Sequence, residues 1–400
     1  MDKTLLSLTH DELTRLGALA TAREIEQQPS LWLKVYDLIA GRREELAAFM
    51  SRAFSHPDLE VVLTGAGSSA FIGEILAGAF RRYTDLPTRP LATTELLTHP
   101  LDFLSEEKAF LLISFARSGN SPESCAVVEL SEKICKKVYH LVITCNKEGA
   151  LAKSAGHTDS CLIVLPPESN DQSLVMTSSF TSMVLAGMLI TRLRELDMLK
   201  NQVETLACYG EKILSTHLPI LKKIAADDFN RAVFLGSGCM TGVARESQLK
   251  LTELTGGFVL GHSDSFLGFR HGPRAMIDPR TLIVYLFSND EYACLYEKDL
   301  VRSVNSGEKG LVSLGIAENR PVPDHTGHLL LLSSGESKLD GDLLMVCYVL
   351  PAQIIGFFKS LYCDLKPDSP SKNGTITRVV EGVNIYQFNY MSSRYPAGQE

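Results

Sequence analysis

The chain has 400 residues, a formal net charge of −8 and 45% apolar residues. This length allows two or more domains around a large core, and the negative charge argues against a nucleic-acid surface or a polybasic membrane patch. Nine scattered cysteines without a C-x-x-C pair argue against a zinc cluster or a disulfide scaffold, so we expect no metal and a cytoplasmic location.

The N-terminal segment, residues 1–50, is predicted to form helices, with Pro29 at the start of the second one. It carries acidic residues and no long apolar run, so we expect no signal peptide. From residue 51 to residue 200, apolar runs typical of buried strands alternate with helical periodicity, which predicts a first α/β domain with a parallel sheet. Its strands are expected at 60–64, 109–114, 138–144 and 161–165, and its helices at 69–83 and 122–136.

Residues 173–226 carry no strand signal and are predicted to form two long helices, in which 201–226 act as a helical connector. The alternation resumes over 227–370 and predicts a second α/β domain, followed by a C-terminal tail at 371–400. The uncharged run 343–358 is too short to span a bilayer, so we expect a buried helix kinked at Pro351. The second domain is expected to have strands at 231–235, 281–287, 310–315 and 328–332, and helices at 241–254, 291–304 and 341–360.

A glycine turn occurs twice, once in each predicted domain. Gly65 and Gly67 follow a short apolar run, and Gly236 and Gly238 repeat the pattern 171 residues later. A strand–turn–helix unit of this kind presents backbone N–H groups and a helix dipole to an anion. The repetition predicts a duplicated unit, whose two turns lie at the carboxyl ends of parallel strands, where such sheets bind their ligands.

The first turn fits the loose dinucleotide fingerprint, but an acidic residue at the end of the next strand is missing, so the match is poor. Hydroxyl side chains favour a phosphate instead. Ser68 and Ser69 follow the turn, and Ser118 and Ser121 follow the next predicted strand, directly before a helix. These serines could simply cap the helices, yet two neighbouring serine loops favour a nest for a phosphate monoester.

The corresponding loop of the second half differs from the first. Gly65 and Ser118 are 53 residues apart, and the same step from Gly236 reaches Asn289, which is followed by Asp290. A carboxylate at this position would repel a phosphate. We therefore expect one phosphate site, in the first half.

The second half carries the ionisable residues. Glu246, Lys250 and Glu253 are spaced to share one face of a helix, which a surface ion-pair ladder would also explain. His271 lies in a turn, where it could equally be a solvated loop residue. Beside a sugar phosphate, a carboxylate can move a proton between C1 and C2, and a histidine can open the ring. Burial would raise the carboxylate pKa, and Lys250 would stabilise an enediolate-like charge.

Together these segments resemble the sugar isomerase (SIS) family, and their duplication is similar to the isomerase half of glucosamine-6-phosphate synthase. A closer resemblance is to the AgaS-type subgroup, described both as galactosamine-6-phosphate deaminase/isomerase and as tagatose-6-phosphate ketose/aldose isomerase. The resemblance implies an α/β fold of two tandem SIS domains, each a parallel-sheet αβα sandwich of flavodoxin-like type. The matching segments include 63–73, 113–124, 143–146, 176–179, 245–255, 268–273 and 370–383.

The resemblance also implies roles for individual residues. The enolisation carboxylate corresponds to Glu253, the assisting lysine to Lys250 and the ring-opening histidine to His271. In the family this histidine reaches the site of the neighbouring subunit, which implies a homodimer with shared sites. No metal or organic cofactor is implied. The expected substrate-binding residues are Gly67, Ser68, Ser69, Arg117, Ser118, Gly119, Asn120, Ser121 and Glu246.

The chain departs from the family pattern in three places. Ala116 replaces a phosphate-binding serine, so that Ser114 or Arg117 would have to compensate. The stretch between the carboxylate and the histidine is longer than in the synthase, and its glycine-rich part, 258–272, is the expected closing loop. Lys372 in the tail does not align securely with the C-terminal lysine that covers the synthase site.

The function that the resemblance implies is conversion of galactosamine 6-phosphate to tagatose 6-phosphate and ammonia, by ring opening, a C1/C2 proton shift and hydrolysis of the resulting imine. The glutamine-hydrolysing domain of the synthase is absent, which favours ammonia release. The galacto configuration rests on the subgroup resemblance alone. The alternatives are a simple aldose–ketose isomerase of hexose 6-phosphates, a non-catalytic sugar-phosphate sensor, which would need neither Glu253 nor His271, and, less favoured, a nucleotide-dependent dehydrogenase.

Overall fold

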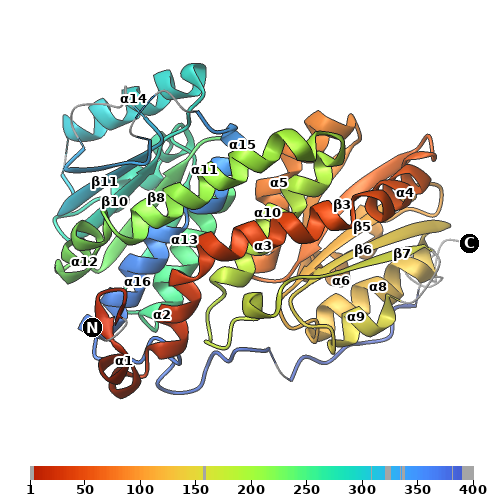
Figure 1. Ribbon diagram of the computed structural model, residues 1–400, viewed down its shortest axis with the longest axis horizontal. Helices are drawn as coiled ribbons and strands as arrows, with labels where there is room; N and C mark the ends of the chain where they lie inside the picture. The colour runs from red at the N-terminus through yellow and green to blue at the C-terminus, as the bar shows by residue number, and fades with distance from the viewer. Residues whose placement is uncertain are drawn as a thin grey trace, which may run out of the picture.

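Two five-stranded parallel sheets lie at opposite ends of the molecule, and helices fill the space between them, as Figure 1 shows. The structure is a computed structural model that describes residues 4–155, 159–307, 309–319, 326–333, 335, 338–380 and 382–389. The sheet orders are β4-β3-β5-β6-β7 and β12-β11-β10-β8-β9. Counted within each half, both read 2-1-3-4-5, the flavodoxin-like order that the resemblance implied.

The strand bounds repeat between the halves as the glycine turns do. β3 and β5 are buried along their whole length, as expected for central strands of a parallel sheet covered on both faces. The first sheet consists of β3 (Leu59–Gly65), β4 (Thr88–Ala92), β5 (Ala109–Ala116), β6 (Lys137–Thr144) and β7 (Ser160–Val164). The second consists of β8 (Arg231–Gly236), β9 (Leu260–Asp264), β10 (Thr281–Leu286), β11 (Val312–Ala317) and β12 (His328–Leu331), and a short hairpin, β1 (Thr4–Leu5) with β2 (Leu8–Thr9), precedes both sheets.

The corresponding strand of each half, β4 in the first and β9 in the second, was not predicted from the sequence. Both are edge strands with few apolar residues, and β4 contains Pro90, so neither carries the apolar run that marks a buried strand. The prediction of a closing loop at 258–272 is therefore wrong for 260–264, because β9 is hydrogen-bonded into the sheet beside β8.

The helical segments are more divided than the sequence indicated. Four helices, not two, occupy the N-terminal region, and three, not two, cover 173–226. The first set is α1 (His10–Leu16), α2 (Leu19–Glu26), α3 (Gln28–Gly41) and α4 (Arg43–Phe54), and the second is α10 (Ser178–Thr191), α11 (Leu196–Leu214) and α12 (Leu218–Ala226). The remaining helices are α5 (Ser68–Thr84), α6 (Thr93–Thr98), α7 (Pro100–Phe103), α8 (Pro122–Ile134), α9 (Ala150–Ser154), α13 (Met240–Leu254), α14 (Glu291–Asn305), α15 (Gly341–Cys347) and α16 (Leu350–Tyr362).

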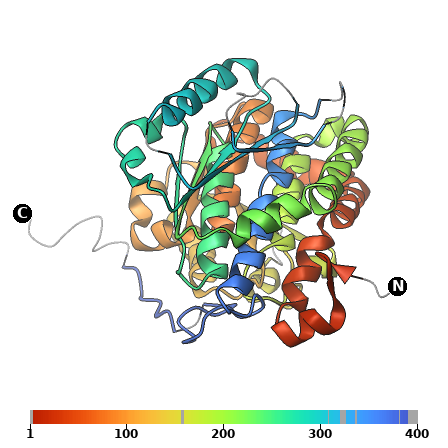
Figure 2. The ribbon, with the colours of Figure 1, turned by 90° about the vertical axis from the view of Figure 1, so that its left-hand side faces the viewer.

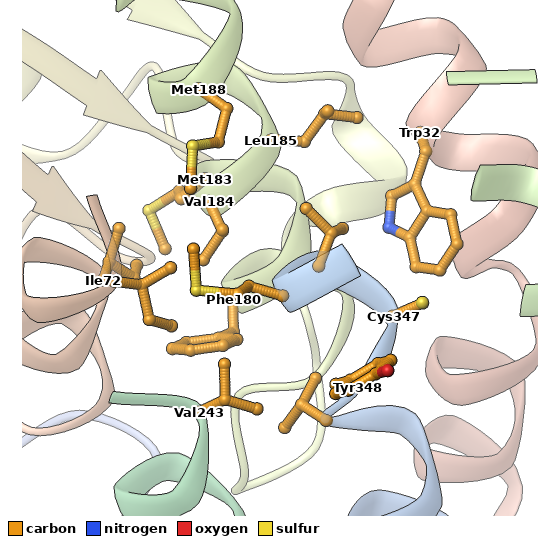
Figure 3. Packing of buried hydrophobic residues seen from close by; sticks show 14 of the residues in the cluster. Trp32, Ile72, Phe180, Met183, Val184, Leu185, Met188, Val243, Cys347 and Tyr348 are labelled. Atoms are coloured by element: carbon orange, nitrogen blue, oxygen red, sulfur yellow. The ribbon is translucent and has the colours of Figure 1, made fainter. Parts of the chain in front are cut away.

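The two halves share one apolar core. Figure 3 shows Trp32 of α3, Ile72 of α5, Phe180 of α10 and Val243 of α13 converging with Tyr348, and all five side chains are buried. Tyr348 also donates a hydrogen bond to the Phe287 carbonyl at 3.0 Å, which satisfies its buried hydroxyl. Because residues from both halves interlock here, we expect the chain to unfold as one cooperative unit.

The uncharged run near the C-terminus forms two consecutive helices, α15 and α16, and Pro351 lies in the first turn of the second. Together they span the 22 residues Gly341–Tyr362, which are long and apolar enough to cross a membrane by length and composition, so the prediction that this segment is too short to span a bilayer is wrong. Of its most apolar window, 94% is buried inside the fold, as in a core helix. The predicted burial and the break near Pro351 are confirmed.

The helices that follow the two glycine turns, α5 and α13, pack against each other. Glu74 of α5 forms an ion pair with Arg245 of α13, and these two residues are themselves 171 positions apart. Equivalent residues that meet each other lie on an axis relating the two halves. Gly242 makes the close approach possible, because a Cβ there would lie 2.7 Å from Ile75 Cγ1. The two glycine turns are therefore held at a fixed distance across this axis.

After α16 the chain returns to the first half as an extended segment, residues 364–380 and 382–389, here called the strap. Figure 1 and Figure 2 show it running along the outside of the molecule toward the first sheet. The Asp368 carboxylate accepts hydrogen bonds from Ala20 N at 3.2 Å and Thr21 N at 2.8 Å, which ties the strap to α2. Phe388 packs on the outer apolar cluster of the first sheet. The strap thus joins the second half to the first.

Replacing Gly73 by alanine is expected to destabilise the first half. A Cβ on Gly73 in α5 would lie 2.8 Å from the Leu63 carbonyl oxygen of β3, and this backbone atom cannot rotate away. Overpacking of this kind costs about 1–3 kcal/mol, measurable by urea unfolding. Gly41→Ala is the matched control, because nothing lies within 4 Å of its added Cβ. Equal midpoints for the two variants would contradict the packing argument.

Candidate functional site

The first glycine turn joins β3 to α5 and leaves the start of that helix uncapped. Gly67 has a φ of +56°, which favours glycine, and none of the side chains that the structure describes caps α5. A Cβ on Gly65 would lie 2.5 Å from Ser69 Cβ, so the turn also requires glycine at the first position. The positive end of the α5 dipole is therefore available to an anion.

The second serine loop, between β5 and α8, lies beside this turn. Ser121 precedes α8 without capping it and donates to Glu123 Oε2 at 2.6 Å, while Ser118 Oγ accepts from the Asn120 backbone N–H at 3.2 Å. A cavity of about 160 Å³ lies between the two loops. The predicted residues that line this cavity, here called the phosphate pocket, are Gly67, Ser69, Arg117, Ser118, Gly119 and Ser121.

Three predicted substrate-binding residues, Asn120, Ser68 and Glu246, do not line the pocket. Asn120 Oδ1 accepts a hydrogen bond from Ala150 N at 3.0 Å, so its side chain holds the start of α9. Ser68 accepts a hydrogen bond from Lys250 Nζ at 3.1 Å. Ser68 therefore connects the first glycine turn to the ionisable residues of the second half.

The three ionisable residues of α13 form a buried cluster. Lys250 Nζ lies 2.6 Å from Glu253 Oε2 and 3.3 Å from Glu246 Oε1. The side chains of Lys250 and Glu246 are fully buried, while that of Glu253 is 23% exposed. A surface ion-pair ladder is therefore wrong. Glu253 is the member of the cluster that solvent, and hence a ligand, can reach.

Burial and the attraction between opposite charges act against each other in this cluster. Burial raises the pKa of Glu246 to about 7, and the opposing attraction of Lys250 does not cancel it. Burial also disfavours the Lys250 ammonium, but the two neighbouring carboxylates outweigh burial and the pKa of Lys250 is raised. Lys250 is therefore charged at neutral pH, whereas Glu246 titrates near neutrality.

Replacing Glu246 by glutamine is expected to change how stability depends on pH. Because the folded-state pKa of Glu246 is raised above its unfolded value, ionisation of this group destabilises the native state progressively from about pH 4.5 to about pH 7. Glu246→Gln should therefore gain stability relative to wild type across this window, by up to about 3 kcal/mol. Urea unfolding at pH 5, 6, 7 and 8 measures the difference, and parallel curves for the two proteins would contradict it.

Arg117 supports the pocket from behind. Its Nη1 lies within hydrogen-bond distance of the carbonyl oxygens of Ser173, Leu174 and Val175, at 3.3, 3.0 and 3.2 Å, and its Nη2 donates to the Arg378 carbonyl. Only 7% of Arg117 is exposed. The side chain was predicted to bind substrate, but its donors are directed to backbone oxygens.

His271 is not joined to the cluster within this chain. It follows the short turn Gly268–Arg270 after β9 and is exposed; its backbone N–H donates to the Gly268 carbonyl at 2.9 Å, while its imidazole makes no hydrogen bond to the described residues. Leu260, the first residue of β9, and Leu267, three residues after its end, are also exposed, by 62% and 47%. An exposed histidine is what a site shared with a second subunit would require.

Sequence reasoning missed a buried acidic network behind the pocket. Asp171 accepts from the backbone N–H groups of Thr177 and Ser179, at 2.8 and 2.9 Å, and Glu24 of α2 accepts from Ser173 N at 3.0 Å. Burial, aided by the Asp171 charge, raises the pKa of Glu24 to about 7. The network fixes the loop that places Met176 on the pocket wall. Glu24 carried no sequence signal, because its hydrogen-bond partner Ser173 lies 149 residues away.

In the second half, the charged groups at the position that corresponds to the phosphate pocket are paired with other groups of the protein. Asp290 Oδ1 accepts from Ala293 N at 2.8 Å, so this carboxylate itself caps α14 where Ser121 leaves α8 open. Arg82 stands 171 positions before Glu253 and binds both oxygens of Asp342, at 2.6 and 2.7 Å. These contacts support the expectation of one phosphate site, in the first half.

Comparison with known proteins agrees with this geometry. The SIS domain profile matches residues 54–192. D-galactosamine-6-phosphate deaminase AgaS of Shewanella sp. (strain ANA-3) is 37% identical over 393 residues, covering 97% of this chain and 96% of that protein.

Solved structures give the same result. A crystal structure from Clostridium novyi NT, named as a candidate tagatose-6-phosphate ketose/aldose isomerase, superposes with a TM-score of 0.94 at 40% identity and covers 97% of this chain and all of that one. Tagatose-6-phosphate ketose/aldose isomerase of Escherichia coli superposes with a TM-score of 0.83 at 32% identity, covering 92% of this chain and 97% of that one. The chain therefore belongs to the SIS-domain family, within the group that contains the AgaS proteins.

Proposed function

We propose that this protein is an amino-sugar phosphate deaminase/isomerase, which converts galactosamine 6-phosphate to tagatose 6-phosphate and ammonia. The observation that carries the proposal is the hydrogen bond between Lys250 and Ser68, at 3.1 Å, because it connects a buried Lys–Glu pair to the turn that borders the phosphate pocket. A sensor would need the pocket but not the pair. The choice of galactosamine 6-phosphate follows the activity named for the AgaS relative of Shewanella.

The proposed chemistry divides the substrate between the two halves. The phosphate lies in the pocket at Ser69, Ser118 and Ser121, and C1 and C2 lie at the cluster. His271 moves a proton from the C1 hydroxyl to the ring oxygen and opens the ring. Glu253 then takes the C2 proton and returns it to C1, while Lys250 stabilises the charge that develops on O1. Water adds to the resulting C2 imine, and ammonia leaves as the ketone forms.

The test is turnover of galactosamine 6-phosphate by the purified protein, with ammonia and ketose phosphate measured in parallel. Equal amounts of both products are expected. Ketose formed from galactose 6-phosphate, with no ammonia from the amino sugar, would favour the simple isomerase. Binding without turnover of any hexose phosphate would favour the sensor. Glucosamine 6-phosphate is the matched control for the configuration at C4.

We also propose that the protein acts as a cytoplasmic homodimer in which His271 serves the partner's site. The exposure of His271 supports a site shared between subunits. The free thiols of all nine cysteines support a cytoplasmic location.

Mixing two inactive variants tests the shared site. In a mixed dimer of Glu253→Gln and His271→Ala subunits, one site lacks both groups and the other has both. Unfolding and refolding an equal mixture should therefore restore about a quarter of wild-type activity. Each variant refolded alone is the control. No recovery, despite hybrid dimers detected by mass spectrometry, would place Glu253 and His271 of one site on the same subunit.

A further inference from the structure

The phosphate pocket is closed on one side by the strap. Arg378, Val379 and Val380 line the cavity together with the serines of the two loops. The strap begins after α16, so these residues come to the first half from the opposite end of the chain. Hydroxyl groups and helix termini provide only partial positive charge, and the charged side chains at the pocket are Arg117, Arg378 and Glu123.

Arg378 has N–H donors that its hydrogen bonds to the described residues leave available. Its Nε donates to the Asp171 carbonyl at 2.8 Å and its Nη2 to Asn170 Oδ1 at 2.8 Å, while Nη1 has no recorded hydrogen bond among the described residues. The side chain is half-buried and forms no ion pair within the described part of the chain. A guanidinium has five N–H donors, and bidentate binding of a phosphate needs two.

We propose that Arg378 is a specificity-determining ligand of the substrate phosphate, held over the pocket by its contacts with Asn170 and Asp171. The proposal rests on the proposed function, since it assigns the phosphate of that substrate to this pocket. Arg378 then supplies the charge that Ser121 and the α5 terminus lack. It also offsets Ala116, which provides no hydroxyl at the position where the family has one.

Arg117 is a positioning residue in this arrangement. Its Nη2 donates to the carbonyl of Arg378 itself, and its Nη1 holds the loop that contains Leu174. Arg117 therefore fixes the backbone of the strap at Arg378, and Arg378 in turn binds the Asp171 carbonyl. Phosphate bound to Arg378 would tighten the strap, and with it the link between the second half and the first.

The test measures inorganic phosphate binding to the full-length protein by calorimetry. Arg378→Gln should weaken phosphate binding by about 10- to 100-fold, because it removes a charged hydrogen-bond donor. Lys372→Gln, which removes an exposed cation from the same strap, should change the dissociation constant by less than about twofold. With galactosamine 6-phosphate, the Arg378 variant should show a raised KM and a kcat close to wild type.

A second variant separates charge from strap position. Asn170→Ala removes a partner that seats Arg378 but keeps its charge, and it should bind phosphate within about threefold of wild type. An equal loss in both variants would mean that Arg378 acts only by holding the strap, which overturns the proposal. Wild-type phosphate binding by Arg378→Gln, with a loss in Ser118→Ala, would overturn it and leave the proposed function standing. If wild type neither binds phosphate nor turns over any hexose phosphate, the proposed function fails too.

Discussion

Replacing Glu253 by glutamine is expected to lower kcat by about 10²- to 10⁴-fold, because the amide cannot accept the C2 proton. The change keeps the side chain nearly isosteric and leaves Lys250 paired with Glu246, so KM and the unfolding midpoint should change little. The coupled ammonia and ketose measurements give kcat directly. Exchange of the C2 proton with deuterium oxide should be lost to the same extent, since it reports the proposed proton transfer itself.

The control for Glu253→Gln is Glu204→Gln, an exposed carboxylate on α11. This variant should retain wild-type kcat and stability, because surface carboxylates contribute little to either. Full activity in Glu253→Gln would show that another group performs the proton transfer. A large fall in its unfolding midpoint would instead show that the carboxylate serves chiefly to neutralise Lys250.

Replacing Lys250 by methionine is expected to have the largest effect on stability. Removing one partner of a buried pair typically costs 3–5 kcal/mol, because the remaining charge is left without compensation. Here Glu246 would remain fully buried beside an apolar side chain. Urea unfolding at pH 8 should show the full loss, and the loss should shrink toward pH 5, where Glu246 is protonated. Activity should be lost at both values of pH.

A double variant separates the two roles of Lys250. Replacing Glu246 and Lys250 together by methionine removes the buried charge pair as a whole, and such replacements are often neutral or stabilising. We expect the double variant to recover most of the stability lost by Lys250→Met and to remain inactive. If the double variant were as unstable as the single one, packing rather than charge would explain the cost of losing Lys250.

Central strands and both glycine turns could be predicted from the sequence, because apolar runs and glycine spacing are local signals. β3 and β5 were placed within a few residues of their bounds. The edge strands β4 and β9 could not be predicted, because their partly exposed residues pair with the sheet through backbone hydrogen bonds, and these leave no pattern in the sequence.

In the site, too, residues marked by local sequence signals could be predicted, whereas those placed by long-range packing could not. Ser69, Ser118 and Ser121 were predictable because each follows a strand whose end is fixed by the sheet. Glu246 is fully buried, whereas Glu253, the carboxylate to which the proton transfer was assigned, is 23% exposed. Arg378 was not predictable, because its place at the pocket depends on how the strap packs across both halves.

The Glu74–Arg245 ion pair has a consequence for how the two halves arose and for what can be done with them separately. In a symmetric pair of identical single-sheet chains, a residue on the axis meets its own copy. Glutamate would then face glutamate, or arginine arginine, and like charges would repel. Opposite charges at this position require two copies that differ in sequence, as the two halves of this chain do. Either half, expressed alone, would therefore bring like charges together if it paired with itself across this face, whereas the two halves expressed together would form the ion pair.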